Sequence, residues 1–206
     1  MVREDVLQLS ENDCFSSGTH RKVYRYSGNE ELLIKIAFNE DGKKDMAREM
    51  YVRNKLAKNN ITSKILPAYH GTVKTNLGQG YIFEYIRDYD GSNSKTLEDY
   101  LQEQSDFASD YEEILRAILE FKQNLLKENI VIMDIFPINI LLQRMADGSL
   151  RPMFINDMGS AALIPLEYYI PALNRKRTLR RWQRFVQYIA VQYPGDKVAA
   201  FLSKIC

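Results

Sequence analysis

Three polar residues in the second half of the chain have the types that a site for a nucleotide and magnesium requires. Asp134 stands within the apolar run 130–136, Asn139 follows it five positions later, and Asp157 opens the tripeptide Asp-Met-Gly. Phosphoryl transfer to a hydroxyl needs oxygen ligands for Mg²⁺ and a group that accepts or positions the hydroxyl. A carboxylate in apolar surroundings is costly unless it is hydrogen-bonded or functional. We therefore expect a functional centre here; the alternative is a turn in which these side chains cap backbone groups.

A lysine and a glutamate in the first half could supply the fixed cation of such a site. Lys35 lies inside the apolar run 32–37, where an unpaired charge is costly to bury. Glu49, in the middle of the next predicted helix, could provide the opposite charge, although Asp45 is on the same helix. The alternative for Lys35 is a solubilising charge on an edge strand.

A turn around Gly18 could approach phosphate groups through its backbone. Gly18, Thr19 and Arg21 lie between two predicted strands. Glycine allows a close backbone approach, and turn amides attract anions. The alternative is an ordinary hairpin turn. The later segment Gly-Gln-Gly at 78–80 has no helix after it, and we interpret it as a hairpin turn.

The candidate residues fall on a predicted series of strands, one helix, further strands and then helices. The β-prone runs 22–26 and 31–37 flank Ser-Gly-Asn, which is a hairpin signal, and helical spacing of apolar residues predicts a helix over 43–58. Two more strands are expected, at 64–74 and 80–86. Helices are expected from 94 onward, notably over 111–128, with a hairpin around Asp-Gly-Ser at 147–149.

Composition limits the classes of protein that the chain can belong to. Its 206 residues suffice for one domain, and 28 Lys and Arg against 27 Asp and Glu give a net charge of +1, so no overall field favours nucleic acid or a membrane. The two cysteines, Cys14 and Cys206, fit a reducing compartment better than a disulfide scaffold. No signal peptide is visible, and no apolar run approaches the ~20 residues that cross a bilayer. We therefore expect a cytoplasmic protein.

The order of the candidate residues resembles the motif set of protein kinases. That set has a glycine loop between strands, a strand lysine, a helix glutamate, Asp-x-x-x-x-Asn and Asp-Phe-Gly. Here Leu-Ile-Lys35, Glu49, the segment from Asp134 to Asn139, and Asp157-Met-Gly stand in that order. More narrowly, Ser-Gly-Thr-His-Arg-Lys at 17–22, Tyr-His-Gly-Thr-Val at 69–73 and Leu-Ile-Pro-Leu at 163–166 are similar to the bacterial YrbL family, which is named for the PhoP regulatory network. The similarity spans nearly the whole chain.

This resemblance implies an α+β, protein-kinase-like two-lobe fold that holds a nucleotide triphosphate between the lobes. The single domain 1–206 would have a small N-lobe at 1–86, made of an antiparallel sheet with one helix, and a truncated, mainly helical C-lobe at 87–206. The implied cofactors are ATP and Mg²⁺.

The resemblance also implies a role for each residue. Asp134 would accept or position the substrate hydroxyl, Asp157 would be the principal magnesium ligand, and Asn139 would bind the second magnesium. Lys35 would hold the α and β phosphates, oriented by Glu49. The remaining contacts would come from the phosphate turn and from the backbone that pairs with adenine: Gly18, Thr19, Arg21, Glu84 and Ile86.

Several positions depart from the kinase pattern. Ile132 and Met133 replace His-Arg, so no arginine precedes Asp134 to receive an activation-loop phosphate. Phe136 replaces the cation that many serine/threonine kinases place two residues after the aspartate. No Ala-Pro-Glu follows Gly159, and only 47 residues remain after it, so the usual peptide-docking part must be reduced or absent.

A basic cluster, Arg175 to Arg184, lies in this short tail. Arginines and a lysine alternate there with Leu179, Trp182 and Phe185 at helical spacing. The cluster could dock a protein substrate or regulatory partner, but a solvated basic face packed by Trp182 is the favoured interpretation. A nucleic-acid adaptor that uses residues 174–185 is a less favoured alternative, which a steep salt dependence of binding would support.

The sequence thus favours an enzyme that transfers the γ-phosphoryl group of ATP to a hydroxyl, with a protein substrate preferred, in a bacterial regulatory pathway. Two alternatives stay open on the same scaffold. One is a pseudokinase, a regulatory binding module without catalysis, because the glycine turn is thin and docking elements are missing. The other is nucleotidyl transfer.

Overall fold

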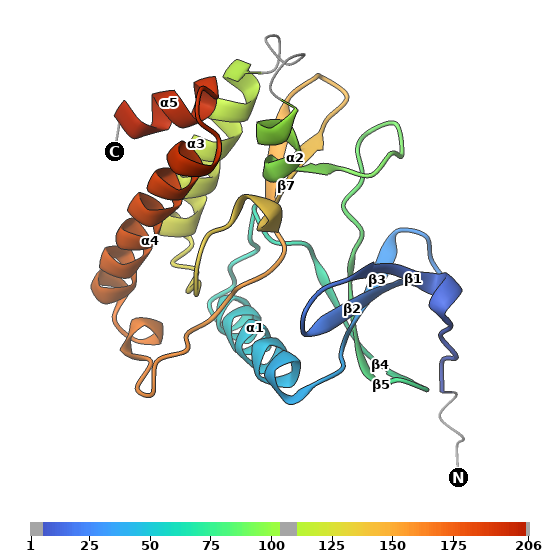
Figure 1. Cartoon of the computed structure of the whole chain (residues 1–206). Coiled ribbons are helices and arrows are strands. Elements are labelled where there is room, and N and C mark those ends of the chain that lie inside the picture. Colours follow the sequence, from blue (N-terminus) through green and yellow to red (C-terminus); the bar gives the residue numbers. More distant parts are fainter. Residues whose placement is uncertain (1–5, 104–110, 205–206) are drawn as a thin grey trace. The chain divides into compact units, whose positions relative to one another are not determined.

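The chain divides into two units that differ in their secondary structure (Figure 1). This computed structural model describes residues 6–103 and 111–204, so Cys206 lies outside the described residues. The first unit holds the chain up to Ala47 together with Pro67–Ile86, and the second holds Arg48–Leu66 and the chain from Arg87 onward. The secondary structure is mixed α and β, as the sequence predicts.

The first unit is built on a five-stranded antiparallel sheet with the strand order β1-β2-β3-β5-β4. In that order β3 is the central strand, so both of its edges are hydrogen-bonded. Lys35 on β3 lies opposite Val23 of β2 on one side and Tyr81 of β5 on the other. The strand bounds are β1 Cys14–Ser17, β2 Arg21–Arg25, β3 Leu32–Ala37, β4 Tyr69–Thr75 and β5 Gly78–Glu84.

Alternation along these strands places one apolar set on the face opposite Lys35. Tyr24, Ile34 and Ile36 are buried there and pack with Leu9. Gly80 of β5 belongs to this face, and a Cβ at that position would lie 2.7 Å from Ile34 Cγ2. The glycine therefore lets β5 approach the side chains of β3.

Helix α1, Glu40–Lys58, is shared by the two units, because the division falls after Ala47. Asn39 precedes it, and its Oδ1 accepts a hydrogen bond of 2.8 Å from the backbone N of Gly42, which satisfies one of the donors that a helix start leaves unpaired. Met46, Val52 and Leu56 are buried along one face.

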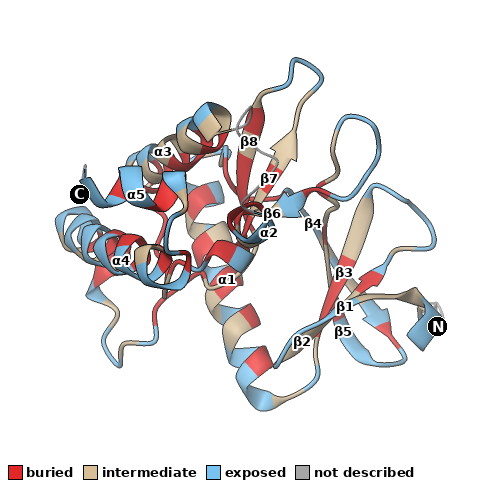
Figure 2. Cartoon of the chain, turned by 45° about the horizontal axis from the view of Figure 1, so that its top comes forward, coloured by how far each residue is buried: buried red, intermediate tan, exposed pale blue. Residues whose placement is uncertain are grey.

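The second unit consists of helices packed around a three-stranded sheet of order β6-β7-β8. Its core is one large apolar cluster with Phe121, Phe154, Trp182 and Phe185 among its members. Figure 2 shows buried positions, in red, along α3, α4 and β8. The bounds are β6 Lys95–Thr96, α2 Leu97–Gln102, α3 Tyr111–Lys127, η2 Pro137–Asn139, β7 Ile140–Arg144, β8 Leu150–Phe154, η3 Leu166–Tyr168, α4 Pro171–Gln192 and α5 Lys197–Lys204.

Two sequence predictions in the first sheet were wrong: the start of one strand and the position of one turn. The strand expected over 64–74 begins only at Tyr69, because Ile65 and Leu66 are buried in the second unit's apolar cluster instead of in the first sheet. The expected turn at 78–80 is also misplaced: Gly78 begins β5, and the turn is made by Asn76 and Leu77.

The helices are amphipathic, and the longest, α4 with 22 residues, is rich in arginine. Within residues 6–103 and 111–204, no helix combines the length and the apolar character needed to span a membrane.

Candidate active site

Two segments of the second unit, 131–133 and 157–159, are joined by their backbones. The N of Met133 donates to the carbonyl oxygen of Asp157 at 2.7 Å, and the N of Gly159 donates to the carbonyl oxygen of Val131 at 2.7 Å. An isolated bridge between Ile132 and Met158 completes the pairing. The loop that carries Asp134 is therefore fixed to the Asp-Met-Gly tripeptide, although the two are far apart in the sequence.

The side chains of Asn139 and Asp157 meet at this junction. Asn139 Nδ2 donates to Asp157 Oδ2 at 2.6 Å, and the carbonyl oxygen of Asn139 accepts a bond of 3.0 Å from the N of Ile155. Asp157 has a φ of +61°, a left-handed conformation that costs a non-glycine residue roughly 1–3 kcal/mol and is common at functional sites. The fold thus holds this carboxylate in an unfavourable backbone conformation beside the amide.

The oxygen atoms of Asn139 and Asp157 are of the kind that could bind a metal ion. Among the described residues there is no group of three or more His, Cys, Asp or Glu that could hold a metal ion. Mg²⁺ typically takes one or two carboxylates and completes its shell with phosphate oxygens and water. Asp157 could supply one carboxylate to such an ion, and the amide of the buried Asn139 beside it could supply a further oxygen.

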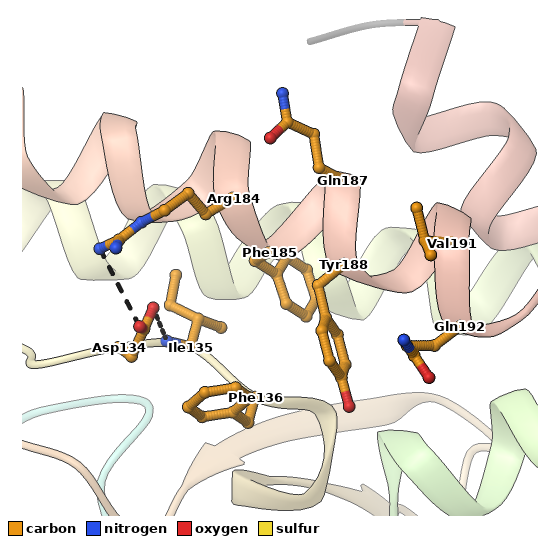
Figure 3. A pocket seen from close by; sticks show the side chains of 9 residues that line it. All are labelled: Asp134, Ile135, Phe136, Arg184, Phe185, Gln187, Tyr188, Val191 and Gln192. Atoms are coloured by element: carbon orange, nitrogen blue, oxygen red, sulfur yellow. Dashed lines mark hydrogen bonds and ion pairs between the residues drawn. The ribbon is translucent and has the colours of Figure 1, made fainter.

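Asp134 lies at one end of a cavity of about 400 Å³ (Figure 3). Its Oδ1 accepts a hydrogen bond of 3.0 Å from the N of Ile135, and its Oδ2 is 3.9 Å from Arg184 Nη2. The carboxylate is about one-third exposed. It is therefore oriented by its own loop, faces a cation from α4 and can be reached from outside.

Three arginines of α4 share one helix face, at positions i, i+4 and i+7. Arg177 forms an ion pair with the fully buried Glu167, and Arg184 faces Asp134. Burial lowers the pKa of Arg181 between them, against the opposing effect of Glu167 and Asp134, and its buried Nη1 has no hydrogen-bond partner within the described residues. Half of the predicted basic cluster thus faces acidic residues of its own unit.

The rest of that cluster matches the sequence interpretation. Arg175, Lys176 and Arg180 are exposed, and Trp182 and Phe185 are buried in the core. Leu179 remains exposed, so it does not belong to the apolar face.

Glu167 holds the segment that follows the Asp-Met-Gly tripeptide. It accepts a hydrogen bond from Ser160 Oγ and pairs with Arg177, while the hydroxyl of Tyr168 accepts a bond of 2.9 Å from the N of Ser160. Burial by itself raises the pKa of Glu167, but the bonds from Ser160 and its own backbone and the charge of Arg177 outweigh burial, so the pKa lies below its ordinary value. Glu167 is therefore an ionised, internally paired residue.

Lys35 is buried in the middle of the first unit's sheet, with an exposed fraction of 9%. Its Nζ lies 4.6 Å from the centre of the Phe83 ring, a cation–π contact. Because β3 is central, the edge-strand interpretation of this lysine was wrong.

Glu49 is buried in α1, with 1% exposed, whereas Asp45 is only partly buried. Arg53, one turn later, donates from Nε to Glu49 Oε1 at 3.1 Å. The structure thus assigns Glu49 a cationic partner on its own helix, which the sequence analysis missed although the i, i+4 spacing was available.

The turn around Gly18 is a hairpin turn, and some of its backbone groups already form hydrogen bonds within the protein. Gly18 N donates to the carbonyl oxygen of Arg21 at 2.9 Å, and Asn39 Nδ2 donates to the carbonyl oxygen of Thr19 at 3.4 Å. Arg21 Nη1 lies 3.7 Å from Met46 Sδ. The turn leads into β2, where Val23 lies opposite Lys35 of β3.

The segment expected to pair with adenine ends β5. The N of Glu84 donates to Ala68 O at 2.9 Å and the N of Tyr85 donates to Glu31 O at 2.8 Å, so these two donors are used within the first unit. These two backbone donors are therefore already bonded within the protein.

The predicted residues thus fall into two groups. The second unit brings Asp134, Asn139 and Asp157 together, and the first unit carries Lys35 in the sheet that begins with the Gly18 turn. Arg184 and Glu167 complete the surroundings of the first group, and the sequence analysis had not assigned them to it.

We expect the Gly159→Ala variant to be less stable than the Gly148→Ala variant by about 1–3 kcal/mol. Both glycines have a left-handed φ, +102° and +84°, so both variants carry the same kind of backbone strain. Only at Gly159 would the new Cβ also meet other atoms, at 2.5 Å from Arg48 Cβ and 3.0 Å from the Tyr168 hydroxyl. Urea unfolding of the two variants measures the difference, and equal losses would mean that the close contact is relieved without cost.

Fold and site together define an α+β protein whose second unit holds a partly buried amide–carboxylate pair beside an accessible aspartate. The family model described as "PhoP regulatory network protein YrbL" matches residues 7–190. The chain belongs to this family.

Two relatives agree with this assignment. The chain is 31% identical over 183 residues to the "Uncharacterized protein YrbL" of Escherichia coli strain K12, and the match covers 88% of this chain and 87% of the relative. The protein of the same name from Shigella flexneri gives the same identity and coverage.

Proposed function

We propose that the protein is a kinase-like phosphotransferase that uses ATP and Mg²⁺ to phosphorylate a hydroxyl, with a protein as the preferred acceptor, in a bacterial regulatory pathway. One observation carries the proposal: the backbone bonds between segments 131–133 and 157–159 and the bond of 2.6 Å between Asn139 and Asp157 bring an Asp-x-x-x-x-Asn segment and an Asp-x-Gly segment together. An aspartate, an asparagine and a second aspartate in this relation suit phosphoryl transfer, where the protein mainly positions groups and stabilises charge.

Each residue has a defined task in the proposal. Asp157 and Asn139 bind the magnesium, which would neutralise negative charge on the phosphates. Asp134 accepts the proton of the acceptor hydroxyl or orients it. Lys35 contacts the α and β phosphates, and the protein-kinase-like two-lobe fold implied by the sequence motifs is part of the same proposal.

The test is to incubate the whole protein with γ-labelled ATP and Mg²⁺, alone and with bacterial extract, beside the Asp134→Ala and Asp157→Ala variants. Label transfer by the wild type that is lost in both variants supports the proposal. Tight nucleotide binding without transfer, over broad screens of substrate and metal, supports the pseudokinase alternative. Absence of nucleotide binding contradicts both.

A regulatory module without catalysis is the second candidate. The observation that supports this candidate is the exposure of three cations of α4, Arg175, Lys176 and Arg180, which could contact an acidic partner. The same assay separates the two candidates, because only the first requires turnover.

We expect Asp157→Asn to weaken the binding of ATP at least tenfold in the presence of Mg²⁺, because the variant loses the carboxylate charge on the metal. Without Mg²⁺, the affinities of variant and wild type should differ far less. Titration calorimetry with and without the metal measures both quantities. Asp90→Asn, an exposed aspartate elsewhere in the second unit, is the matched control and should bind as the wild type does. A loss of affinity that does not depend on Mg²⁺ would contradict a metal role for Asp157.

A further inference from the structure

The cavity beside Asp134 has an aromatic wall next to its one carboxylate. Phe136, two residues after Asp134, packs edge-to-face against Tyr188 of α4, with ring centres 5.8 Å apart and an angle of 88° between the planes. Phe185 is buried behind them. Figure 3 shows Asp134 and Arg184 at one end of the cavity and the aromatic side chains along it.

The aromatic rings are only partly covered by the protein. Phe136 is 37% exposed and Tyr188 is 36% exposed, and Val191 extends the apolar surface on the next turn of α4. Large apolar side chains that stay exposed around a polar group mark a binding surface. About 400 Å³ is enough room for one aromatic side chain with part of its backbone.

The geometry points to a phenolic acceptor: the cavity binds a tyrosyl side chain of a protein, with the hydroxyl at Asp134 and the ring against Phe136 and Tyr188. This inference rests on the proposed function and names its substrate class. It follows from the position of the carboxylate at the end of an apolar wall, because tyrosine combines an apolar body with a polar tip.

A serine or threonine would fit this cavity less well. Its hydroxyl is attached next to the backbone, so placing that hydroxyl at Asp134 would press polar peptide groups against the aromatic wall, where they lose hydrogen bonds to water. A tyrosyl ring instead separates the hydroxyl from the peptide and contacts Phe136 and Tyr188 with its own apolar surface. An additional aromatic contact favours binding beyond the buried area alone.

The chemistry of a phenol also suits a carboxylate base. With a pKa near 10, a phenol gives up its proton more readily than an aliphatic alcohol does. In the proposed step the tyrosyl oxygen forms a bond to the γ-phosphorus of ATP and the bond from that phosphorus to the β–γ bridging oxygen breaks. ADP leaves, and the phenolic proton passes to Asp134. Many serine/threonine kinases have a cation two residues after the aspartate, where this chain has Phe136. Here Arg184 of α4, 3.9 Å from Asp134, supplies a positive charge near the carboxylate.

The experiment uses the whole protein and three peptides, acetyl-Ala-Ala-X-Ala-Ala-amide with Tyr, Phe or Ser as X. Binding without nucleotide is followed by NMR shifts of the Phe136 and Tyr188 backbone amides, and transfer is followed with γ-labelled ATP and Mg²⁺. We expect the tyrosine peptide to bind most tightly and to be the one that is labelled. Tyr188→Ala should weaken its binding about three- to tenfold. Phe136→Leu, which keeps an apolar side chain, should also weaken binding of the tyrosine peptide. This variant replaces Tyr188→Ala in the test if Tyr188→Ala does not fold.

Tyr89→Ala is the matched control, because Tyr89 is an exposed tyrosine of the same unit outside the cavity. It should leave binding unchanged. Equal binding of the serine and tyrosine peptides, no binding of any of the three, or labelling of serine alone would overturn the phenolic acceptor; labelling of serine would leave the phosphotransferase proposal intact. Binding of the tyrosine peptide at this cavity without any transfer supports the cavity's specificity and counts against the phosphotransferase.

Discussion

Replacing Asp134 by asparagine is expected to reduce phosphoryl transfer by about 10²–10⁴-fold while ATP binding changes little. The amide keeps the shape and can still accept the hydrogen bond from the N of Ile135, but it cannot take a proton from the acceptor hydroxyl. General base catalysis by a positioned side chain contributes a factor of this size. The measurement is the initial rate of label transfer from γ-labelled ATP at saturating nucleotide, together with a nucleotide titration of the same preparation.

Asp147→Asn is the matched control for that variant. Asp147 lies in the exposed hairpin between β7 and β8, where its Oδ1 accepts a bond of 2.6 Å from Ser149 Oγ. Its substitution removes the same charge from the same unit without reaching the cavity. Full transfer activity in Asp134→Asn would remove Asp134 from the reaction, and an equal loss in both variants would indicate an effect of net charge.

The local elements of the fold were predictable because their signals lie within short stretches of sequence. Alternating apolar residues predicted β2 and β3, and the spacing of apolar residues predicted α1 and α3. The hairpin at 147–149 followed from its turn residues. The two-residue strand β6 was missed, and the strand expected before Gly18, now β1, had no predicted bounds, since such short strands depend on the neighbours that they pair with.

Tertiary context explains the failed prediction at 64–68. Ile65 and Leu66 look like the start of a strand, but both are buried in the second unit's core, and the N of Phe154 bonds to the carbonyl oxygen of Ile65. A single sequence does not say which core an apolar residue joins. Pro67 was the available signal, because proline removes a backbone donor from a sheet.

The candidate site shows the same distinction. Asp134, Asn139 and Asp157 were predicted from residue type and spacing; the structure joins the side chains of Asn139 and Asp157 and bonds Met133, the residue before Asp134, to the carbonyl oxygen of Asp157. The contacts of Arg184 with Asp134 and of Arg177 with Glu167 join residues from separate elements, so only the helical spacing of the arginines hinted at them. That spacing shows that Arg177, Arg181 and Arg184 share a face, but it does not reveal what the face meets.

Glu167→Gln is expected to lower the free energy of unfolding by about 1–3 kcal/mol at neutral pH, because a neutral group replaces the buried carboxylate that pairs with the partly exposed Arg177. The folded protein lowers the pKa of Glu167, so the unfolded state binds the proton more tightly. The stabilisation is therefore fully present above the ordinary pKa of glutamate, about 4.3, and is lost as the pH falls through the lower folded value. Urea unfolding from about pH 7 to about pH 3 measures the free energy of unfolding of the wild type and of the variant. The difference between these two free energies should become smaller only at the acidic end.

An exposed ion pair provides the control for this pH dependence. Glu113 pairs with Arg116 on the surface of α3 at 2.7 Å, and such pairs contribute about 0–1 kcal/mol. Glu113→Gln should thus change stability little at any pH. If Glu167→Gln behaves in the same way, the ion pair with Arg177 does not hold the segment after Gly159. If it is destabilised, the Glu167–Arg177 double variant should recover part of the loss, because the partly exposed cation that has lost its carboxylate is also removed. That recovery would show that this ion pair helps to hold α4, which also carries Arg184 and Tyr188, against the segment after the tripeptide.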